Sequence, residues 1–305
     1  MIDWNGVYPA VTTKFTQDDE LDLKSFEHNI MYQIKAGIHG IILGGTLGES
    51  STLNDEEKET LIKATVEMVN GKVPVVMNIA EQSTKKAIKA VEAATKCGVK
   101  GLMLLPPMRY YADDRETVNY FKEVAGSTDL PIMLYNNPID YKILITLDMF
   151  EELEVCSNIT AVKDSTRQLS NVTKMINRFG DRFKVLTGVD PLAFESLALG
   201  AHGWVAGLVC AFPKETVAIY ELIQQGRYEE ALVIYRWFYD LLELDISPRL
   251  VQYIKLAEVA TGLGTENVRS PRLPIVGKDR ERVLKIIDDS LKIRPAIPNL
   301  DQISV

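Results

Sequence analysis

Eight short apolar runs are spaced along the chain up to residue 209, and each is followed by a longer stretch with helical periodicity. The runs span residues 6–13, 40–45, 73–80, 101–107, 131–137, 159–165, 183–188 and 204–209. They are almost continuously apolar, as is typical of parallel strands that are buried on both faces. Their alternation with amphipathic stretches predicts a series of βα units.

Three of the predicted helix-to-strand turns carry two glycines that are three residues apart. The pairs are Gly37 and Gly40, Gly98 and Gly101, and Gly200 and Gly203. The first glycine suits the position after a helix end, where φ is positive, and the second begins the next strand. Two helices are also expected to begin with capping boxes, Asn54 with Glu57 and Asp113 with Glu116. Such turns and caps support parallel strands joined by helices.

The repeated units predict a closed (β/α)8 barrel, a TIM barrel, over residues 1–225, with a doubly wound open sheet as the structural alternative. After Pro213 the pattern is wholly helical. Residues 226–305 are therefore predicted to form a C-terminal helical extension packed on the barrel rather than an independent domain. The aromatic and aliphatic stripes of these helices are expected to be core or subunit contacts.

Composition and charge argue against several classes of function. The chain has 305 residues and a formal net charge of −8, so it lacks the broad basic surface that nucleic acid or an anionic membrane requires. Its first residues do not have the layout of a signal peptide, and no apolar run approaches the roughly 20 residues of a membrane helix. Cys97, Cys156 and Cys210 lie beside apolar neighbours, which predicts buried, reduced thiols. We therefore expect a soluble cytoplasmic protein.

Polar residues follow the predicted strands at the end where a TIM barrel carries its chemistry. Among these ends, only that of the sixth strand carries a lysine, Lys163, after an uninterrupted apolar stretch. A buried amine without a full counter-charge has a lowered pKa, and a neutral amine can attack a carbonyl carbon to form a Schiff base. The alternative is a structural lysine whose ammonium reaches water or pairs with Asp164.

Two other segments fit Schiff-base chemistry. Tyr135 ends the fifth strand, where its hydroxyl either relays protons or simply faces water. The glycine-rich loop at 44–50 lacks the spacing of a P-loop or a dinucleotide fingerprint, and its backbone N–H groups suit a smaller anion such as a carboxylate. The three histidines are far apart in sequence, so no metal site, no Ser/His/Asp triad and no cofactor is expected.

Together these residues resemble the dihydrodipicolinate synthase and N-acetylneuraminate lyase superfamily of Schiff-base barrels. The resemblance covers nearly the whole chain and rests on G-T-x-G-E-S at 45–50, Y-N-x-P at 135–138, A-V-K-D-S at 161–165 and G-x-D at 188–190. It implies a Schiff base between Lys163 and a 2-oxo acid or equivalent imine, with Tyr135 as proton relay. It also implies that the substrate-binding residues are Gly45, Thr46, Leu47, Asp140, Ser165 and Val205.

The chain departs from the synthases of this superfamily at three places. Asp140 stands where they usually carry an arginine that holds a second carboxylate of the substrate, and Leu47 stands where they have threonine. Met108-Arg109 occupies the position of the tyrosine that a neighbouring subunit normally donates, which leaves Tyr110 or Tyr111 as replacements. The proton relay of the synthases is therefore expected to be broken.

Segments 105–114, 135–138 and 203–213 are most similar to the hydroxyproline-catabolic branch of the superfamily. That branch contains 1-pyrroline-4-hydroxy-2-carboxylate deaminase, which forms 2,5-dioxopentanoate and ammonia. In such a reaction Lys163 would take over the imine carbon, the 4-hydroxyl would leave, and hydrolysis would release the ammonia. The alternatives are a sugar-acid dehydratase or a 2-oxo-acid aldolase of the same superfamily, or a non-catalytic sensor of a small acid. The resemblance also implies a homo-oligomer, a tetramer built as a dimer of dimers.

Overall fold

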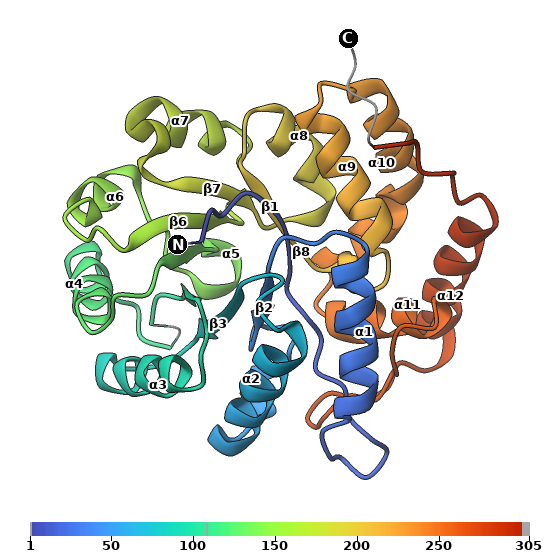
Figure 1. The fold of residues 1–305 in the computed structure, drawn as a ribbon, viewed down its shortest axis with the longest axis horizontal. Coiled ribbons are helices and arrows are strands. Elements are labelled where there is room, and N and C mark those ends of the chain that lie inside the picture. The colour runs from blue at the N-terminus through green and yellow to red at the C-terminus, as the bar shows by residue number, and fades with distance from the viewer. Residues whose placement is uncertain (1, 108, 301–305) are drawn as a thin grey trace.

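The computed structural model describes residues 2–107 and 109–300 (Figure 1). Its eight parallel strands follow the order β1-β8-β7-β6-β5-β4-β3-β2. The strands are β1 (Gly6–Pro9), β2 (Ile41–Leu43), β3 (Val75–Ile79), β4 (Gly101–Leu104), β5 (Ile132–Asn136), β6 (Ile159–Asp164), β7 (Lys184–Thr187) and β8 (Gly203–Ala206). The sheet closes where Ala10 bridges Ile42 and the N–H of Val11 donates to the carbonyl of Ile42 at 3.1 Å. The predicted TIM barrel is confirmed, and the open-sheet alternative is wrong.

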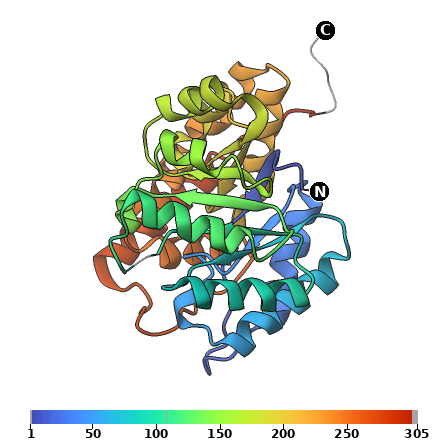
Figure 2. The same cartoon turned by 90° about the vertical axis from the view of Figure 1, so that its left-hand side faces the viewer.

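Helices surround the strands, as Figures 1 and 2 show. Those of the barrel are α1 (Leu23–Lys35), α2 (Asp55–Val69), α3 (Thr84–Lys96), α4 (Asp114–Ala125), α5 (Pro138–Tyr141), α6 (Leu147–Leu153), α7 (Ser170–Phe179), α8 (Ala193–Ala198) and α9 (Pro213–Gln224). Short 3-10 turns are η1 (Ser50–Thr52), η2 (Gly180–Arg182), η3 (Asp190–Leu192) and η4 (Leu208–Cys210). The C-terminal part contains α10 (Tyr228–Leu242), η5 (Glu243–Ile246), α11 (Leu250–Ala260) and α12 (Gly277–Lys292).

The local signals that the sequence predicted are present in the structure. Asn54 and Glu57 exchange the two hydrogen bonds of a capping box at the start of α2. A second box, between Asp113 and Glu116, begins α4. The first glycine of each predicted turn has a positive φ: 95° at Gly37, 94° at Gly98 and 99° at Gly200. These glycines let each helix end and turn directly into the next strand.

All eight strands are shorter than the apolar runs predict. At the carboxyl ends of β1 and β8, hydrogen bonds with side chains take the place of the strand ladder. After β1, the hydroxyl of Thr12 donates to Glu258 at 2.6 Å and that of Thr13 to the carbonyl of Gly48 at 2.6 Å. After β8, the N–H groups of Gly207 and Leu208 donate to a buried carboxylate instead of to a neighbouring strand. The carboxyl end of the barrel is thus built from side-chain contacts.

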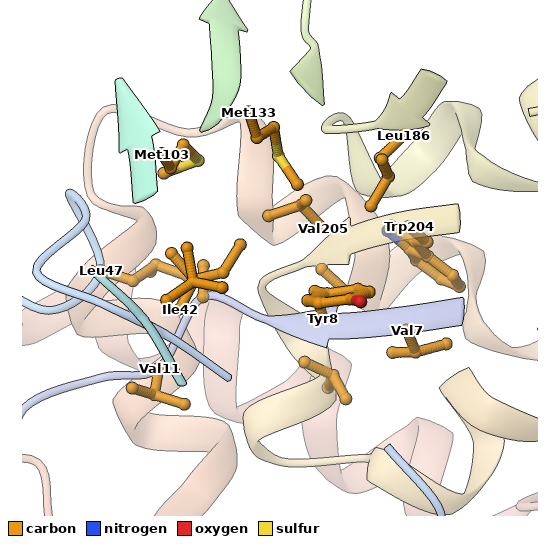
Figure 3. Packing of buried hydrophobic residues seen from close by; sticks show 14 of the residues in the cluster. Val7, Tyr8, Val11, Ile42, Leu47, Met103, Met133, Leu186, Trp204 and Val205 are labelled. Carbon is orange, nitrogen blue, oxygen red and sulfur yellow. The ribbon is translucent and has the colours of Figure 1, made fainter. Parts of the chain in front are cut away.

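The interior of the barrel is filled by side chains. Tyr8 of β1 lies beside Val205 of β8 in register, and Met103 of β4 lies beside Met133 of β5. Figure 3 shows these residues together with Ile42 in one apolar layer. The barrel is therefore a packed core rather than a pore, so substrate chemistry belongs at its rim.

The C-terminal helices are joined to the barrel by two buried ion pairs. Lys14 lies 2.7 Å from Glu258, and Lys255 lies 2.6 Å from Glu49, with all four side chains completely buried. The proposed division after residue 225 falls in the turn between α9 and α10. In the described part of the chain, no helix is long and apolar enough to cross a membrane. Cys97 and Cys210 are buried as expected, whereas Cys156 is only half-buried, and all three thiols are free.

Candidate active site

Lys163 lies near the carboxyl end of β6, in register with Tyr135 of β5 and Leu186 of β7. Residues paired in register on parallel strands point to the same face, so these three side chains enter the barrel together. Lys163 is 8% exposed, and its Nζ lies 4.1 Å from the centroid of the Tyr135 ring. Burial lowers the pKa of Lys163, and the nearby Asp245 carboxyl opposes this effect most strongly.

Lys163 differs from the other two buried lysines of the described residues in having no close counter-charge. Lys14 and Lys255 each hold a carboxylate within 2.7 Å, which keeps their ammonium groups paired. No carboxylate of the described residues lies within 4.0 Å of the Lys163 amine in an ion pair. Its amine is therefore the buried amine best suited to lose its proton and act as a nucleophile.

The space for the lysine comes from Gly188, directly after β7. A Cβ at this position would lie 2.4 Å from Cε of Lys163 and 2.4 Å from Oγ of Ser165. The Ser165 hydroxyl also donates to the Gly188 carbonyl at 3.0 Å. The glycine of the G-x-D segment thus lets the lysine and serine side chains lie against the β7 backbone.

We expect Gly188→Ala to slow imine formation on Lys163 by about 100-fold, because small misplacements of a nucleophile have effects of this size. Borohydride trapping of a pyruvate adduct, with circular dichroism as a control for folding, measures the effect. Equal trapping rates in the folded variant and the wild type would show that Lys163 does not react from this position.

The Tyr135 hydroxyl belongs to a small polar group at the end of β5. Nδ2 of Asn137 donates to Oη of Tyr135 at 3.2 Å and to Oδ2 of Asp140 at 2.7 Å. Burial raises the pKa of Tyr135 to about 12, so the hydroxyl keeps its proton at neutral pH. The hydrogen bond that Asn137 donates to the Tyr135 hydroxyl partly offsets this rise. The structure thus brings Tyr135, Asp140 and Ser165 together beside Lys163.

The loop after β2 approaches the same group of residues. The Thr46 hydroxyl lies 3.4 Å from Oη of Tyr141, whose ring packs edge-on against Tyr135 with centroids 5.5 Å apart. The backbone N–H groups of Thr46 and Leu47 donate no hydrogen bond to any described residue. Unpaired backbone N–H groups in a tight turn suit an anion. With Gly45 beside them, these residues form a candidate carboxylate site.

The buried Glu49 side chain ties this loop to the C-terminal part of the chain. Its backbone is left-handed, with φ of 51°, and its carboxylate accepts from Nζ of Lys255 at 2.6 Å and from the N–H of Arg269 at 3.0 Å. The loop is therefore fixed to α11 of the C-terminal extension. The C-terminal extension therefore helps to hold the loop of the candidate site in place.

Asp190, the acid of the G-x-D segment, organises the end of β8. Its carboxylate accepts from Nε1 of Trp204 at 2.9 Å, from the N–H of Gly207 at 3.1 Å and from that of Leu208 at 2.8 Å. Burial raises the pKa of Asp190, and these hydrogen bonds oppose the rise. Its contacts assign it a positioning role at the rim.

Val205 belongs to the apolar layer of the barrel beside Met133 and Leu186, and Leu186 is in register with Lys163 (Figure 3). Its role in substrate binding stays a prediction. Tyr110 and Tyr111 are 60% and 71% exposed, and the Tyr110 hydroxyl donates to Glu116 at 3.0 Å. Met108 lies outside the described residues.

Sequence reasoning assigned no role to Tyr141, Gly188 or Asp245. Tyr141 follows Pro138 by three positions, which places it one helical turn from the Y-N-x-P segment and was an available signal. Asp245 had no such signal, because it lies in the helical extension. Among the described residues, no group of three or more His, Cys, Asp and Glu side chains is placed to hold a metal ion.

Comparisons with known proteins identify relatives of this barrel. A family model described as the dihydrodipicolinate synthetase family matches residues 3–290. An uncharacterized DapA-like lyase of Rhizobium meliloti is 32% identical, with 93% of this chain and 96% of the relative covered. The 4-hydroxy-tetrahydrodipicolinate synthase of Methanococcus maripaludis is 31% identical, with 97% and 98% covered.

Solved structures similar to this barrel include enzymes of the same family. Dihydrodipicolinate synthase from Bacillus anthracis is 30% identical, with a TM-score of 0.90 and coverage of 94% of this chain and 99% of that one. The enzyme from Acinetobacter baumannii, solved in complex with pyruvate, is 26% identical, with a TM-score of 0.88 and coverage of 95% and 99%. The family match over nearly the whole length, with the shared barrel, places the protein among lyase-type enzymes: the chain belongs to the dihydrodipicolinate synthetase family.

Proposed function

We propose that this protein is a class I lyase that binds a 2-oxo acid as a Schiff base on Lys163. The observation that carries the proposal is the buried, unpaired Lys163 amine, packed on Tyr135 beside a loop with free backbone N–H groups. The complex of the Acinetobacter baumannii relative with pyruvate supports a 2-oxo acid as the ligand.

The reaction begins when the neutral Nζ of Lys163 attacks the keto carbon of the substrate. The N–H groups of Thr46 and Leu47 hold the substrate carboxylate, which orients that carbon toward the amine. The Tyr135 hydroxyl passes a proton to the departing hydroxyl of the carbinolamine, so that water leaves and a protonated imine remains. The imine acidifies the C–H of the neighbouring carbon, and the Tyr135 oxygen, which has given up its proton, takes the proton from that carbon to leave an enamine. The enamine then forms a C–C bond to an aldehyde or expels a hydroxyl from the next carbon; C–C cleavage is the reverse of bond formation. Hydrolysis of the imine then returns free Lys163.

The relatives favour the aldolase-type alternative over the deaminase that segment similarity suggested, because they carry the names synthase and lyase. A deaminase acting on 1-pyrroline-4-hydroxy-2-carboxylate is our second candidate. Asp140, at the position where the synthases have an arginine, favours this candidate. The side chain of Asn137 links Asp140 to the Tyr135 hydroxyl by donating a hydrogen bond to each. An acid at this position suits a substrate with one carboxylate and a hydroxyl group.

A panel of substrates separates these candidates. Pyruvate with aldehyde acceptors tests aldol chemistry, deoxy sugar acids test dehydration, and 4-hydroxy-pyrroline carboxylate tests deamination, with 2-oxo acid and ammonia as readouts. Release of ammonia from 4-hydroxy-pyrroline carboxylate, with no turnover of pyruvate plus aldehydes or of deoxy sugar acids, would overturn the aldolase-type proposal in favour of the deaminase. A protein that binds these acids without converting any of them would be the non-catalytic sensor.

The lowered pKa of Lys163 predicts the pH dependence of imine formation. Burial favours the neutral amine, so the rate of pyruvate trapping should rise with pH through a midpoint below 10.5, the ordinary lysine value. The rate of borohydride trapping, measured from samples quenched at fixed times between pH 6 and about 10 at constant pyruvate concentration, gives this pH dependence. A midpoint at or above the ordinary value would indicate an exposed or ion-paired amine.

The homotetramer that the resemblance implies and the cytoplasmic location expected from the composition both stay predictions. One solved relative is described as a monomeric dihydrodipicolinate synthase variant, so the family itself does not fix the assembly. The mass of the protein in solution, from light scattering after size-exclusion chromatography, determines the oligomeric state.

A further inference from the structure

The side chain of Tyr141 joins the loop after β2 to the end of β5. Its hydroxyl oxygen lies 3.4 Å from Oγ1 of Thr46, and its ring packs edge-on against Tyr135 with the centroids 5.5 Å apart. The centroid of the Tyr135 ring in turn lies 4.1 Å from Nζ of Lys163. Tyr141 therefore connects the loop of the candidate carboxylate site, through Tyr135, to the reacting amine.

The backbone around Tyr141 limits the positions that its side chain can take. Tyr141 is the last residue of α5, and its N–H donates to the carbonyl of Asn137, the N-cap of that helix, at 3.0 Å. The next residue, Lys142, is left-handed with φ of 64°, which ends the helix. The side chain of Asn136 closes the segment, because it donates to the carbonyl of Ile145 at 2.9 Å and accepts from its N–H at 3.0 Å. A hydrogen-bonded turn thus fixes Tyr141 relative to β5.

The hydroxyl groups of Tyr141 and Thr46 retain one proton that their contact does not use. Two hydroxyl groups carry two O–H donors, and a hydrogen bond between them uses one. Their separation of 3.4 Å exceeds the roughly 2.7–2.8 Å that is usual for such a bond, and no other group of the described residues forms a hydrogen bond with the Tyr141 hydroxyl. Burial raises the pKa of Tyr141, so this hydroxyl keeps its proton at neutral pH. The pair therefore has a donor available for a ligand.

This donor belongs to the same turn as the free backbone N–H groups. The N–H groups of Thr46 and Leu47 donate to no described residue. Thr46 is exposed and Tyr141 is half-buried, so a small acid can reach the pair from solvent without displacing the core. A carboxylate has about four acceptor positions on its two oxygens, so the N–H groups and a hydroxyl can bind it together.

We propose that Tyr141 has two separable roles in this site: its hydroxyl group completes the donor set for the substrate carboxylate, and its ring positions the Tyr135 side chain. The inference rests on the proposed Schiff base at Lys163 and adds the residue that connects carboxylate binding to proton transfer. An edge-on contact between aromatic rings restricts the orientation of both rings. Without the Tyr141 ring, the Tyr135 hydroxyl loses the orientation that proton transfer to the carbinolamine requires.

Two variants of Tyr141 separate these roles. Borohydride trapping of pyruvate, measured by intact mass over a range of pyruvate concentrations, gives a half-saturating concentration and a maximal rate. We expect Tyr141→Phe, which keeps the ring, to raise the half-saturating concentration by roughly 10-fold to 100-fold, the effect of losing one hydrogen bond to a charged group, and to leave the maximal rate unchanged. Tyr141→Leu, which also loses the ring, should in addition lower the maximal rate by about 10-fold or more.

The matched controls are Tyr228→Phe and Tyr228→Leu, at an exposed tyrosine that begins α10. They remove the same groups away from the site and should keep both wild-type values. Circular dichroism and urea unfolding identify the variants that are folded, and only these are compared.

The outcomes separate failure of this inference from failure of the proposed function. If the wild type traps no pyruvate, the Schiff-base function is wrong. If the wild type traps pyruvate and Tyr141→Phe keeps its half-saturating concentration, the hydroxyl does not bind the carboxylate and the inference is wrong. A folded Tyr141→Leu with the maximal rate of Tyr141→Phe would show that the ring does not position Tyr135. A lower maximal rate of Tyr141→Phe at an unchanged half-saturating concentration would also overturn the inference, because the hydroxyl would then act in proton transfer.

Discussion

Lys163→Met abolishes turnover, with an expected loss of roughly 1,000-fold or more, because no other group of the site can form an imine. Methionine keeps most of the aliphatic volume that fills the space beside Gly188 and Tyr135. The same change should leave the free energy of unfolding equal or higher. The lowered pKa means that the folded state disfavours the charged amine, so removing the amine removes that cost.

Activity assays on the preferred substrate, combined with urea unfolding, measure both effects. Lys89→Met, at an exposed position of α3, is the matched control and should behave like the wild type. A Lys163→Met protein that folds and retains a tenth or more of the wild-type activity would rule out imine chemistry at this lysine.

Lys255→Met is expected to destabilise the protein by about 3–5 kcal/mol, because it leaves the buried Glu49 carboxylate without its main partner. Glu49 would keep the N–H of Arg269 at 3.0 Å and the more distant Arg272 guanidinium at 3.8 Å. This loss is a large part of the roughly 5–15 kcal/mol that holds a typical domain together. Since Glu49 holds the loop that contains the candidate carboxylate site, Gly45 to Leu47, KM for the 2-oxo acid should also rise.

Urea unfolding of Lys255→Met alone and together with Glu49→Gln tests the origin of the loss. The double variant removes the unpaired charge and should regain part of the stability that the single variant loses. A single variant destabilised by less than about 1 kcal/mol would mean that the pair is hydrated and does not fix the loop.

The barrel could be predicted because its signals are local. The apolar runs, the glycines at Gly37, Gly98 and Gly200, and the capping boxes each act within a few residues. The ends of the strands could not be predicted in the same way. Thr12 leaves the β1 ladder because Glu258, from α11, accepts its hydrogen bond. The two residues are 246 positions apart, and the hydrophobic periodicity of a short segment carries no information about a contact over that distance.

In the site, too, some features follow from local sequence and others depend on long-range packing. Lys163 and Tyr135 are neighbours in register, so their meeting follows from the strand order of a barrel once their strands are recognised. Asp245 meets Gly207 through the packing of η5 on the rim, which depends on the whole extension. Similarity of short segments predicted a deaminase, whereas the names of the relatives favour aldolase-type chemistry.

Lys163 is expected to be the nucleophile among the three buried lysines of the described residues. Reduction with borohydride in the presence of pyruvate, followed by proteolysis and peptide mass analysis, tests it directly. The structure predicts one adduct, on the peptide that contains Lys163, because the amines of Lys14 and Lys255 are held in ion pairs of 2.7 and 2.6 Å. An adduct on either of those lysines, or a protein without any adduct, would contradict this account.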